Sequence, residues 1–168
     1  MVSLIEQDFL KNKKLYKNVE KSLRKRLGSG VPIEHVGSTA IPNMCGKNII
    51  DILVGVKGAD EFEKVKSILL EEGYFAGKHP TEIYQFFASS EKETGDGDVH
   101  IHLVVESTER YKEFVLLRDF LLSHPDEARE YANCKKELLA QGVTDRKEYR
   151  AKKSEYVTQM IERAKLAK

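Results

Sequence analysis

Long apolar runs are missing from this sequence. No stretch approaches the ~20 consecutive apolar residues that a membrane-spanning helix needs. Residues 1–17 carry charges throughout and contain no long apolar segment of the kind found in a secretory signal peptide. We therefore expect a soluble, cytoplasmic protein with no membrane partner.

Cysteine is scarce too. Cys45 and Cys134 are the only two in the chain, and they stand far apart and outside any CxxC motif. The missing export signal and the high content of charged residues favour two free thiols over a disulfide.

Neither sign of charge dominates, since 28 Lys and Arg residues face 27 Asp and Glu residues, for a formal net charge of +1. This balance excludes a strong electrostatic field around the whole molecule. Binding of nucleic acid through bulk charge is therefore not expected, although a local basic groove is still allowed.

Linkers rich in Pro, Gly or Ser are absent as well, and no internal repeat is present. The hydrophobic content of 40% and the length of 168 residues suit one globular core. We expect a single domain over residues 1–168, with a helical C-terminal part from about residue 108.

The pattern of apolar residues divides the chain into three zones. Residues 3–27 have apolar side chains three or four apart, with a break near residues 10–15, which predicts two helical stretches. Residues 31–105 predict a sheet, with strands at 31–36, 49–56, 84–87 and 99–105. A helix capped by Asp60 and ending near Gly73 follows the second strand, and a turn at 95–98 makes the last two strands an antiparallel hairpin.

Residues 108–168 predict a helical layer. Thr108 begins the first helix, which holds Leu122 among its inward-facing residues, and His124-Pro125 ends it. Asp126 then caps a second helix, which ends at Gly142, and Thr144 or Asp145 starts the last one. The fold class is α+β, with helices packed on one face of a sheet and this layer added.

A polar cluster begins where the first strand ends. Gly37-Ser38 forms a tight turn whose backbone N–H groups, with the Ser38 and Thr39 hydroxyls, are suited to face an anion such as a phosphate. Asp51 stands inside an apolar strand, where a carboxylate is costly unless it meets a cation, a hydrogen bond or solvent. Strand alternation places Asp51 and Ile50 on opposite faces of the sheet. The helices need not cover the face that holds Asp51.

The same alternation places His100 and His102 together on one face of the 99–105 strand. Two imidazoles beside one carboxylate suit a metal ion or an anion, depending on pH. If this strand is the neighbour of the strand that holds Asp51, the three side chains converge.

A Gly-Ser turn followed by an aspartate in an apolar strand resembles the signature of the DNA-polymerase-β-like nucleotidyltransferases. Within that superfamily the chain closely resembles the GrpB family, whose pattern is similar to His-(Ile/Val)-Gly-Ser-Thr-x-(Ile/Val)-Pro…Lys-Pro-Ile-Ile-Asp-Ile. The resemblance covers roughly residues 5–160. The matching positions are His35 to Pro42, Lys47, Ile49 to Ile52, His100-x-His102, Leu117-Arg118-Asp119-Phe120-Leu121 with His124-Pro125, Tyr131-x-x-x-Lys135 and Tyr149-x-x-x-Lys153.

The resemblance implies a nucleotidyltransferase-like mixed sheet and a site for a nucleotide or another phosphorylated metabolite. Asp51 and Lys47 are then the candidate catalytic residues. One divalent metal (Mg, Mn or Zn) has Asp51, His100 and His102 as candidate ligands. The candidate substrate-binding residues are Gly37, Ser38, Thr39, Lys47, Arg118, Lys135 and Lys153, of which the four cations would direct charge toward a phosphate.

The chain departs from the pattern of an active transferase. Such enzymes hold two Mg²⁺ ions with three carboxylates. Here Leu53 stands at the second carboxylate position, and His100 and His102 face the site where the third is expected. One aspartate and two histidines favour a single borderline transition metal over paired Mg²⁺. Asn48 also replaces the usual Pro, which can loosen the approach to Asp51.

Three functions stay open at this point. The first is a nucleotidyl or phosphoryl transferase with a degenerate metal site, and the second is a catalytically inactive nucleotide- or metabolite-binding module. The third is a small interaction protein. Leu53 favours the second over a two-metal transferase, whereas the presence of Asp51 with both histidines argues against the third.

Simpler roles also stay open for the individual residues. Asp51 can pair with Lys47 or Arg118, and the two histidines can belong to a solvated strand face. Lysine and arginine side chains on helices usually face solvent.

Overall fold

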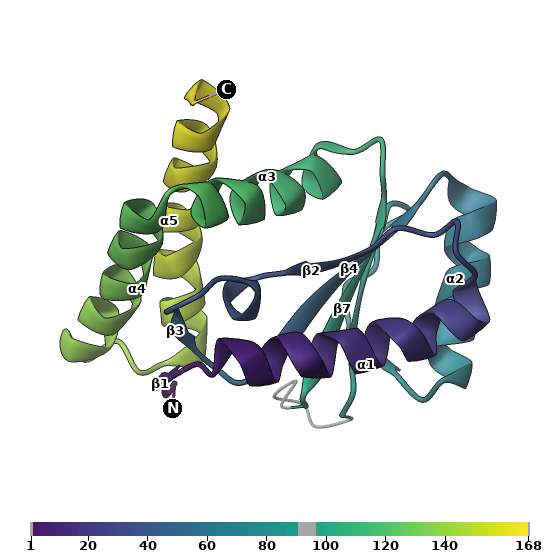
Figure 1. Ribbon diagram of the computed structural model, residues 1–168, viewed down its shortest axis with the longest axis horizontal. Coiled ribbons are helices and arrows are strands. Elements are labelled where there is room, and N and C mark those ends of the chain that lie inside the picture. The colour runs from purple at the N-terminus through teal and green to yellow at the C-terminus, as the bar shows by residue number, and fades with distance from the viewer. Residues whose placement is uncertain (1, 91–96, 168) are drawn as a thin grey trace.

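The computed structural model of the chain describes residues 2–90 and 97–167 (Figure 1). The turn expected at 95–98 lies partly outside these residues. In chain order the elements are β1 (Ile5–Glu6), α1 (Phe9–Leu27), β2 (Ile33–Val36), the 3₁₀ turn η1 (Ser38–Ala40), β3 (Cys45–Gly46), β4 (Ile50–Val56), α2 (Ala59–Glu71), β5 (Phe75–Ala76), β6 (Tyr84–Ala88), β7 (Val99–Val105), α3 (Glu109–Ser123), α4 (Pro125–Ala140) and α5 (Arg146–Leu166).

The main sheet is mixed and has the strand order β2-β4-β7-β6-β5. The central pair β4–β7 is parallel, whereas β2–β4, β6–β7 and β5–β6 are antiparallel. The α+β class, the mixed sheet and the β6–β7 pairing are thus confirmed. The parallel central pair has the greatest consequence for function, because it aligns the start of β4 with the start of β7.

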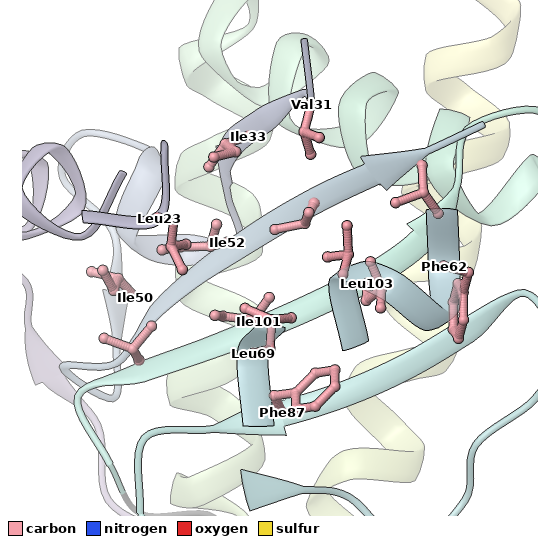
Figure 2. Packing of buried hydrophobic residues seen from close by; sticks show 14 of the residues in the cluster. Leu23, Val31, Ile33, Ile50, Ile52, Phe62, Leu69, Phe87, Ile101 and Leu103 are labelled. Carbon is pink, nitrogen blue, oxygen red and sulfur yellow. The ribbon is translucent and has the colours of Figure 1, made fainter. Parts of the chain in front are cut away.

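The main hydrophobic core lies between this sheet and helices α1 and α2. Alternate residues of β4 and β7, such as Ile52 and Ile101, point into it and have no solvent exposure. Leu23 of α1 and Leu69 of α2 meet them from the helical side (Figure 2). The remaining residues of β4 and β7 therefore point to the other face of the sheet.

Helix α3 partly covers that other face. Leu53 of β4 packs there with Val36 and Val104, and Phe114 of α3 lies against this cluster. The expectation that helices need not cover the Asp51 face is therefore wrong at the Leu53 end. The helices α4 and α5 continue this layer beyond the sheet, where they pack with the segment around Cys45 (Figure 1).

The N-terminal zone differs from the prediction of two helices. Ile5–Glu6 forms a short strand that pairs with β3, and a single helix follows from Phe9 to Leu27, capped by Asp8. The polar stretch that suggested a break does not interrupt the helix. Its Asn12 is buried, and its side-chain amide donates a hydrogen bond of 3.5 Å to the amide oxygen of Asn48.

Two predicted helix caps are also wrong. Asp60 lies inside the first turn of α2, where Gly58 is the capping residue. Asp126 lies inside the first turn of α4, because Pro125 occupies the first helical position, where its fixed φ is favourable. Acidic residues inside a first turn still oppose the positive end of the helix dipole.

The other helix boundaries agree with the prediction. Thr108 and Asp145 cap α3 and α5 with their side chains, and Gly142 follows α4 with a positive φ of 81°. Leu122 is an exception among the residues expected to point inward, since it is 46% exposed.

Cys45 and Cys134 are free thiols, as expected. The described part of the chain contains no helix that is both long and apolar enough to cross a membrane.

Candidate functional site

Asp51 lies directly beside His100 in the sheet, because the two are register partners on the parallel strands β4 and β7. Leu53 and His102 are the next partners on the same face. The predicted convergence of one carboxylate and two imidazoles therefore occurs, and the polarity and register of the central strand pair produce it.

One oxygen of Asp51 faces both histidines. Its Oδ1 atom lies 3.4 Å from His100 Nδ1 and 3.5 Å from His102 Nε2, and the Asp51 side chain keeps 26% of its surface exposed. Burial alone would raise the pKa of this carboxyl, but the interactions with His100 and His102 outweigh it and hold the pKa well below its usual range. Asp51 is therefore an anion at physiological pH.

Tyr84 extends this polar chain, and sequence reasoning missed it. Its hydroxyl lies 3.0 Å from His102 Nδ1, and burial raises its pKa, so the phenol keeps its proton. His102 therefore lies between the two groups, with Nδ1 facing the Tyr84 phenol and Nε2 facing the Asp51 carboxylate. The alternation of β6, which puts Tyr84 and Phe86 on one face, was the available signal.

Aromatic rings surround the two histidines. Phe86 lies edge-on to His100 with ring centroids 4.9 Å apart, and Phe114 of α3 lies 4.7 Å from His102. These contacts limit the orientations of both imidazoles. The histidines are thus partly buried and are not part of a solvated strand face.

The Gly37 turn lies against the other oxygen of Asp51. Gly37 has a φ of +72°, a conformation that side chains disfavour, and a Cβ atom there would stand 2.3 Å from Asp51 Oδ2. The close approach therefore requires glycine. It places the turn that precedes η1 immediately beside the carboxylate.

The hydroxyls of the turn have internal partners. Thr39 is buried, and its Oγ1 atom lies 3.0 Å from Nε2 of His35. Ser38 Oγ accepts a hydrogen bond of 3.2 Å from the side-chain amide of Gln7, which also donates to the carbonyl of Lys47 at 2.6 Å. The turn is therefore stabilised by its own polar contacts.

Arg118 forms hydrogen bonds with residues of β2 and of its own helix. Its guanidinium donates to Glu34 at 2.6 Å, to Asp119 at 2.8 Å and to the His35 carbonyl at 3.4 Å. These bonds connect α3 to β2. The alternative in which Arg118 pairs with Asp51 does not occur.

One lysine of the helical layer, Lys135, is buried, and a second, Lys153, is partly buried. The Lys135 ammonium group donates to the carbonyl of Cys45 and lies over the Tyr131 ring, 4.6 Å from its centre. Burial lowers the pKa of Lys135 to about 8. Burial also lowers the pKa of Lys153, although the charge of Asp51 opposes that shift. Lys153 is thus an electrostatic neighbour of the candidate site.

The donor atoms do not form a two-metal site. Leu53 fills the second carboxylate position and has no solvent exposure. Among the described residues, no group of three or more His, Cys, Asp and Glu side chains is arranged to hold a metal ion. Two Mg²⁺ ions held by carboxylates therefore do not fit these residues.

Comparison with known proteins decides the family. The family model described as GrpB protein matches residues 5–163. This chain belongs to the GrpB family. The glutamate-rich protein GrpB of Alkalihalophilus pseudofirmus is 31% identical over 89% of this chain and 88% of its own length.

Other GrpB relatives are longer than this chain. The UPF0157 protein PA4798 of Pseudomonas aeruginosa is 37% identical over 80% of this chain, but the match spans only 56% of that protein. The UPF0157 protein YqkA of Bacillus subtilis is 32% identical over 80% of this chain, and the match spans 39% of its length.

Solved structures establish the fold of this GrpB-family chain. The conserved protein GrpB of Enterococcus faecalis superposes with a TM-score of 0.81 over 96% of both chains at 21% identity. The poly(A) polymerase complex GLD-2–GLD-3 has a TM-score of 0.55 over 84% of this chain and 49% of that chain, at 12% identity. The fold is thus nucleotidyltransferase-like, as the sequence resemblance implied.

Proposed function

We propose that this GrpB-family domain binds a phosphorylated small molecule, with a nucleotide as the first candidate, at the Asp51 face of β4 and β7. The supporting observation is the convergence of Asp51, His100 and His102 beside the Gly37 turn. A partly exposed carboxylate is kept ionised there by two neighbouring imidazoles. Such a group can accept hydrogen bonds from a ligand hydroxyl or amine, or share a cation with a phosphate.

Cationic groups on the helical layer support a phosphorylated ligand. Lys153 interacts electrostatically with Asp51. The ammonium group of Lys135 lies in the interior, where it loses the free energy of hydration. The Tyr149 hydroxyl of α5 is buried and has no hydrogen-bond partner among the described residues. A phosphate would offset the lysine charges and supply an acceptor for that hydroxyl.

Binding is favoured over two-metal nucleotidyl transfer because of Leu53. Its side chain is part of an apolar cluster beneath α3, so no second carboxylate can approach Asp51 from that position without repacking the cluster. A second candidate function is proton transfer at the bound ligand. The chain Tyr84–His102–Asp51 favours it, because it connects a protonated phenol to an ionised carboxylate through one imidazole.

The proposal includes one divalent ion, Mg²⁺, Mn²⁺ or Zn²⁺, held by Asp51, His100 and His102 together with oxygens of the bound ligand, since the three side chains alone are not arranged to hold an ion. The separations of 3.4 and 3.5 Å between Asp51 Oδ1 and the two nitrogens exceed those of ordinary hydrogen bonds. They are close to the roughly 3.4 Å between ligand atoms that share a tetrahedral ion at 2.0–2.1 Å. An ion there would supply Lewis acidity, and ligand or water oxygens would have to complete its shell.

A thermal-shift panel of nucleotides and other phosphorylated metabolites tests the binding. We expect at least one ligand to raise the melting temperature of the wild type and to lose this effect in Asp51→Asn. Asp60→Asn, an exposed aspartate on α2, is the matched control and should keep the full shift. If no ligand shifts the wild type, or if Asp51→Asn shifts equally, the binding proposal is wrong.

Two further variants address the phosphate. Lys153→Met should weaken the binding of a phosphorylated ligand more than the binding of its unphosphorylated counterpart. Lys152 is the exposed neighbour of Lys153 on α5, and Lys152→Met should affect the binding of neither ligand. Assaying the ligand that binds for turnover then separates a binding module from an enzyme.

Titration with Zn²⁺ and Mn²⁺ tests the ion separately. We expect the double variant His100→Ala/His102→Ala to abolish binding of both metals, while the exposed pair His79→Ala/His124→Ala leaves it intact. An unchanged titration in the first variant would reject these ligands and leave the ligand-binding proposal standing.

A further inference from the structure

Basic residues are concentrated on α1, although the chain as a whole is nearly neutral. The 19 residues of α1 contain eight Lys and Arg side chains and a single acid, Glu20. Since the whole chain has 28 basic and 27 acidic residues, the rest carries 20 basic and 26 acidic residues. Helix α1 thus has a formal charge of +7, and the remainder of the protein has −6.

Five lysines line one side of this helix. At 100° per residue, Lys11, Lys14, Lys17, Lys21 and Lys25 fall within about 120° of one another, opposite the core side that holds Tyr16 and Leu23. All five are exposed. Because a helix rises 1.5 Å per residue, this lysine stripe is about 21 Å long.

The stripe is poorly neutralised. Lys17 shares Glu20 with Arg24, at 2.8 Å and 3.0 Å. Within residues 2–90 and 97–167, Lys14, Lys21 and Lys25 form no ion pair. A surface hollow of about 600 Å³ lies along the stripe between Lys17 and Lys25. The arrangement is a row of exposed positive charges along one side of α1.

We propose that the lysine stripe of α1 binds the phosphate backbone of a nucleic-acid strand without reading its sequence. Lysine is a point charge suited to such contacts, and the one acid of α1, Glu20, is paired with Lys17 and Arg24. A linear polyanion engages the stripe alone. A flat anionic membrane would also lie within a Debye length, about 8–10 Å, of the residues around the stripe. Because the protein outside α1 has a net charge of −6, the membrane would be repelled by that part of the protein.

Leu10 is the one exposed large apolar side chain on α1, and the apolar side of the helix packs against the sheet, so the stripe lacks the whole apolar face that an interfacial helix inserts into lipid. This binding goes beyond the Asp51 site and does not depend on it. Asp51 faces away from the core that α1 covers, so the two sites can be tested separately.

Fluorescence anisotropy with a labelled 20-nucleotide single strand tests the proposal at 50 mM salt. We expect binding by the wild type, a loss of roughly tenfold or more in the variant Lys14→Gln/Lys21→Gln/Lys25→Gln, and a salt slope smaller by about 2. The control Lys64→Gln/Lys78→Gln/Lys147→Gln removes the same charge from exposed positions on other segments and should bind like the wild type.

Three results would overturn the stripe proposal: no binding by the wild type at 50 mM salt, an equal loss in both triple variants, or binding to phosphatidylserine vesicles but not to the oligonucleotide. Asp51→Asn should bind the oligonucleotide like the wild type. A failure of the stripe proposal is thereby distinguished from a failure of the Asp51 proposal.

Discussion

Gly37 and Asp51 form a pair in which the backbone of one residue fixes the position of the other. The carboxylate fits beside the turn only because no Cβ atom is present at Gly37. The two histidines lie beside the other oxygen of the same carboxylate, Asp51 Oδ1. Asp51 is therefore held between the Gly37 turn and β7, and the two histidines of β7 keep it ionised.

Replacing Gly37 by alanine tests this pairing. Gly37→Ala places a side chain at a positive φ, at a cost of about 1–2 kcal/mol, and also displaces Asp51. We expect its loss in unfolding free energy, measured by urea denaturation, to exceed that of Gly28→Ala. Gly28 has a φ of +82° but nothing within 4 Å of an added Cβ, so it reports the strain alone. Equal losses would show that the carboxylate does not occupy that space.

Strands β4 and β7 show how far the sequence could predict the site. Alternation along each strand is a local property, so it placed Asp51, His100 and His102 on their correct faces. The parallel pairing that makes Asp51 a neighbour of His100 depends on the path of the chain through α2, β5 and β6. No pattern within either strand encodes that path.

The position of α3 over the sheet could not be predicted from the sequence either. Its apolar residues are spread around the helix, because it touches both the sheet and the helices α4 and α5. The cover that it places over Leu53 was therefore not expected. Similarly, β1 and β3 have two residues each, which is too short for a recognisable strand pattern.

The contacts of α3 lead to a prediction for Leu53. Leu53→Asp restores the carboxylate expected of the superfamily, but it buries a charge in the cluster beneath α3. We expect a loss of about 3–5 kcal/mol in unfolding free energy and no gain in Mg²⁺ affinity. Leu53→Met, which keeps the volume and the apolar character, should cost less than about 1.5 kcal/mol. A stable Leu53→Asp protein that binds Mg²⁺ would contradict this packing.

For the molecule as a whole, His35 makes stability depend on pH. Its ring stacks on Tyr16 with centroids 4.6 Å apart, and burial lowers its pKa from 6.5 to about 4. Between these values the unfolded chain binds a proton that the folded chain does not. Stability is therefore lost as the pH falls through this window, and the full shift corresponds to about 3 kcal/mol.

Urea unfolding between pH 7 and pH 4.5 measures this effect. The variant His35→Gln removes the titrating group and should lose less stability over the same range than the wild type. Parallel pH profiles for the two proteins would show that His35 does not contribute.

The central claim is that a phosphorylated ligand binds at Asp51, His100 and His102. The most direct measurement is nuclear magnetic resonance of ¹⁵N-labelled histidine side chains during titration with the ligand that raises the melting temperature. The five histidines of the chain include the exposed His79 and His124, which serve as internal references. We predict that the His100 and His102 signals shift with ligand while those two stay constant. Unchanged His100 and His102 signals at saturating ligand would contradict the account.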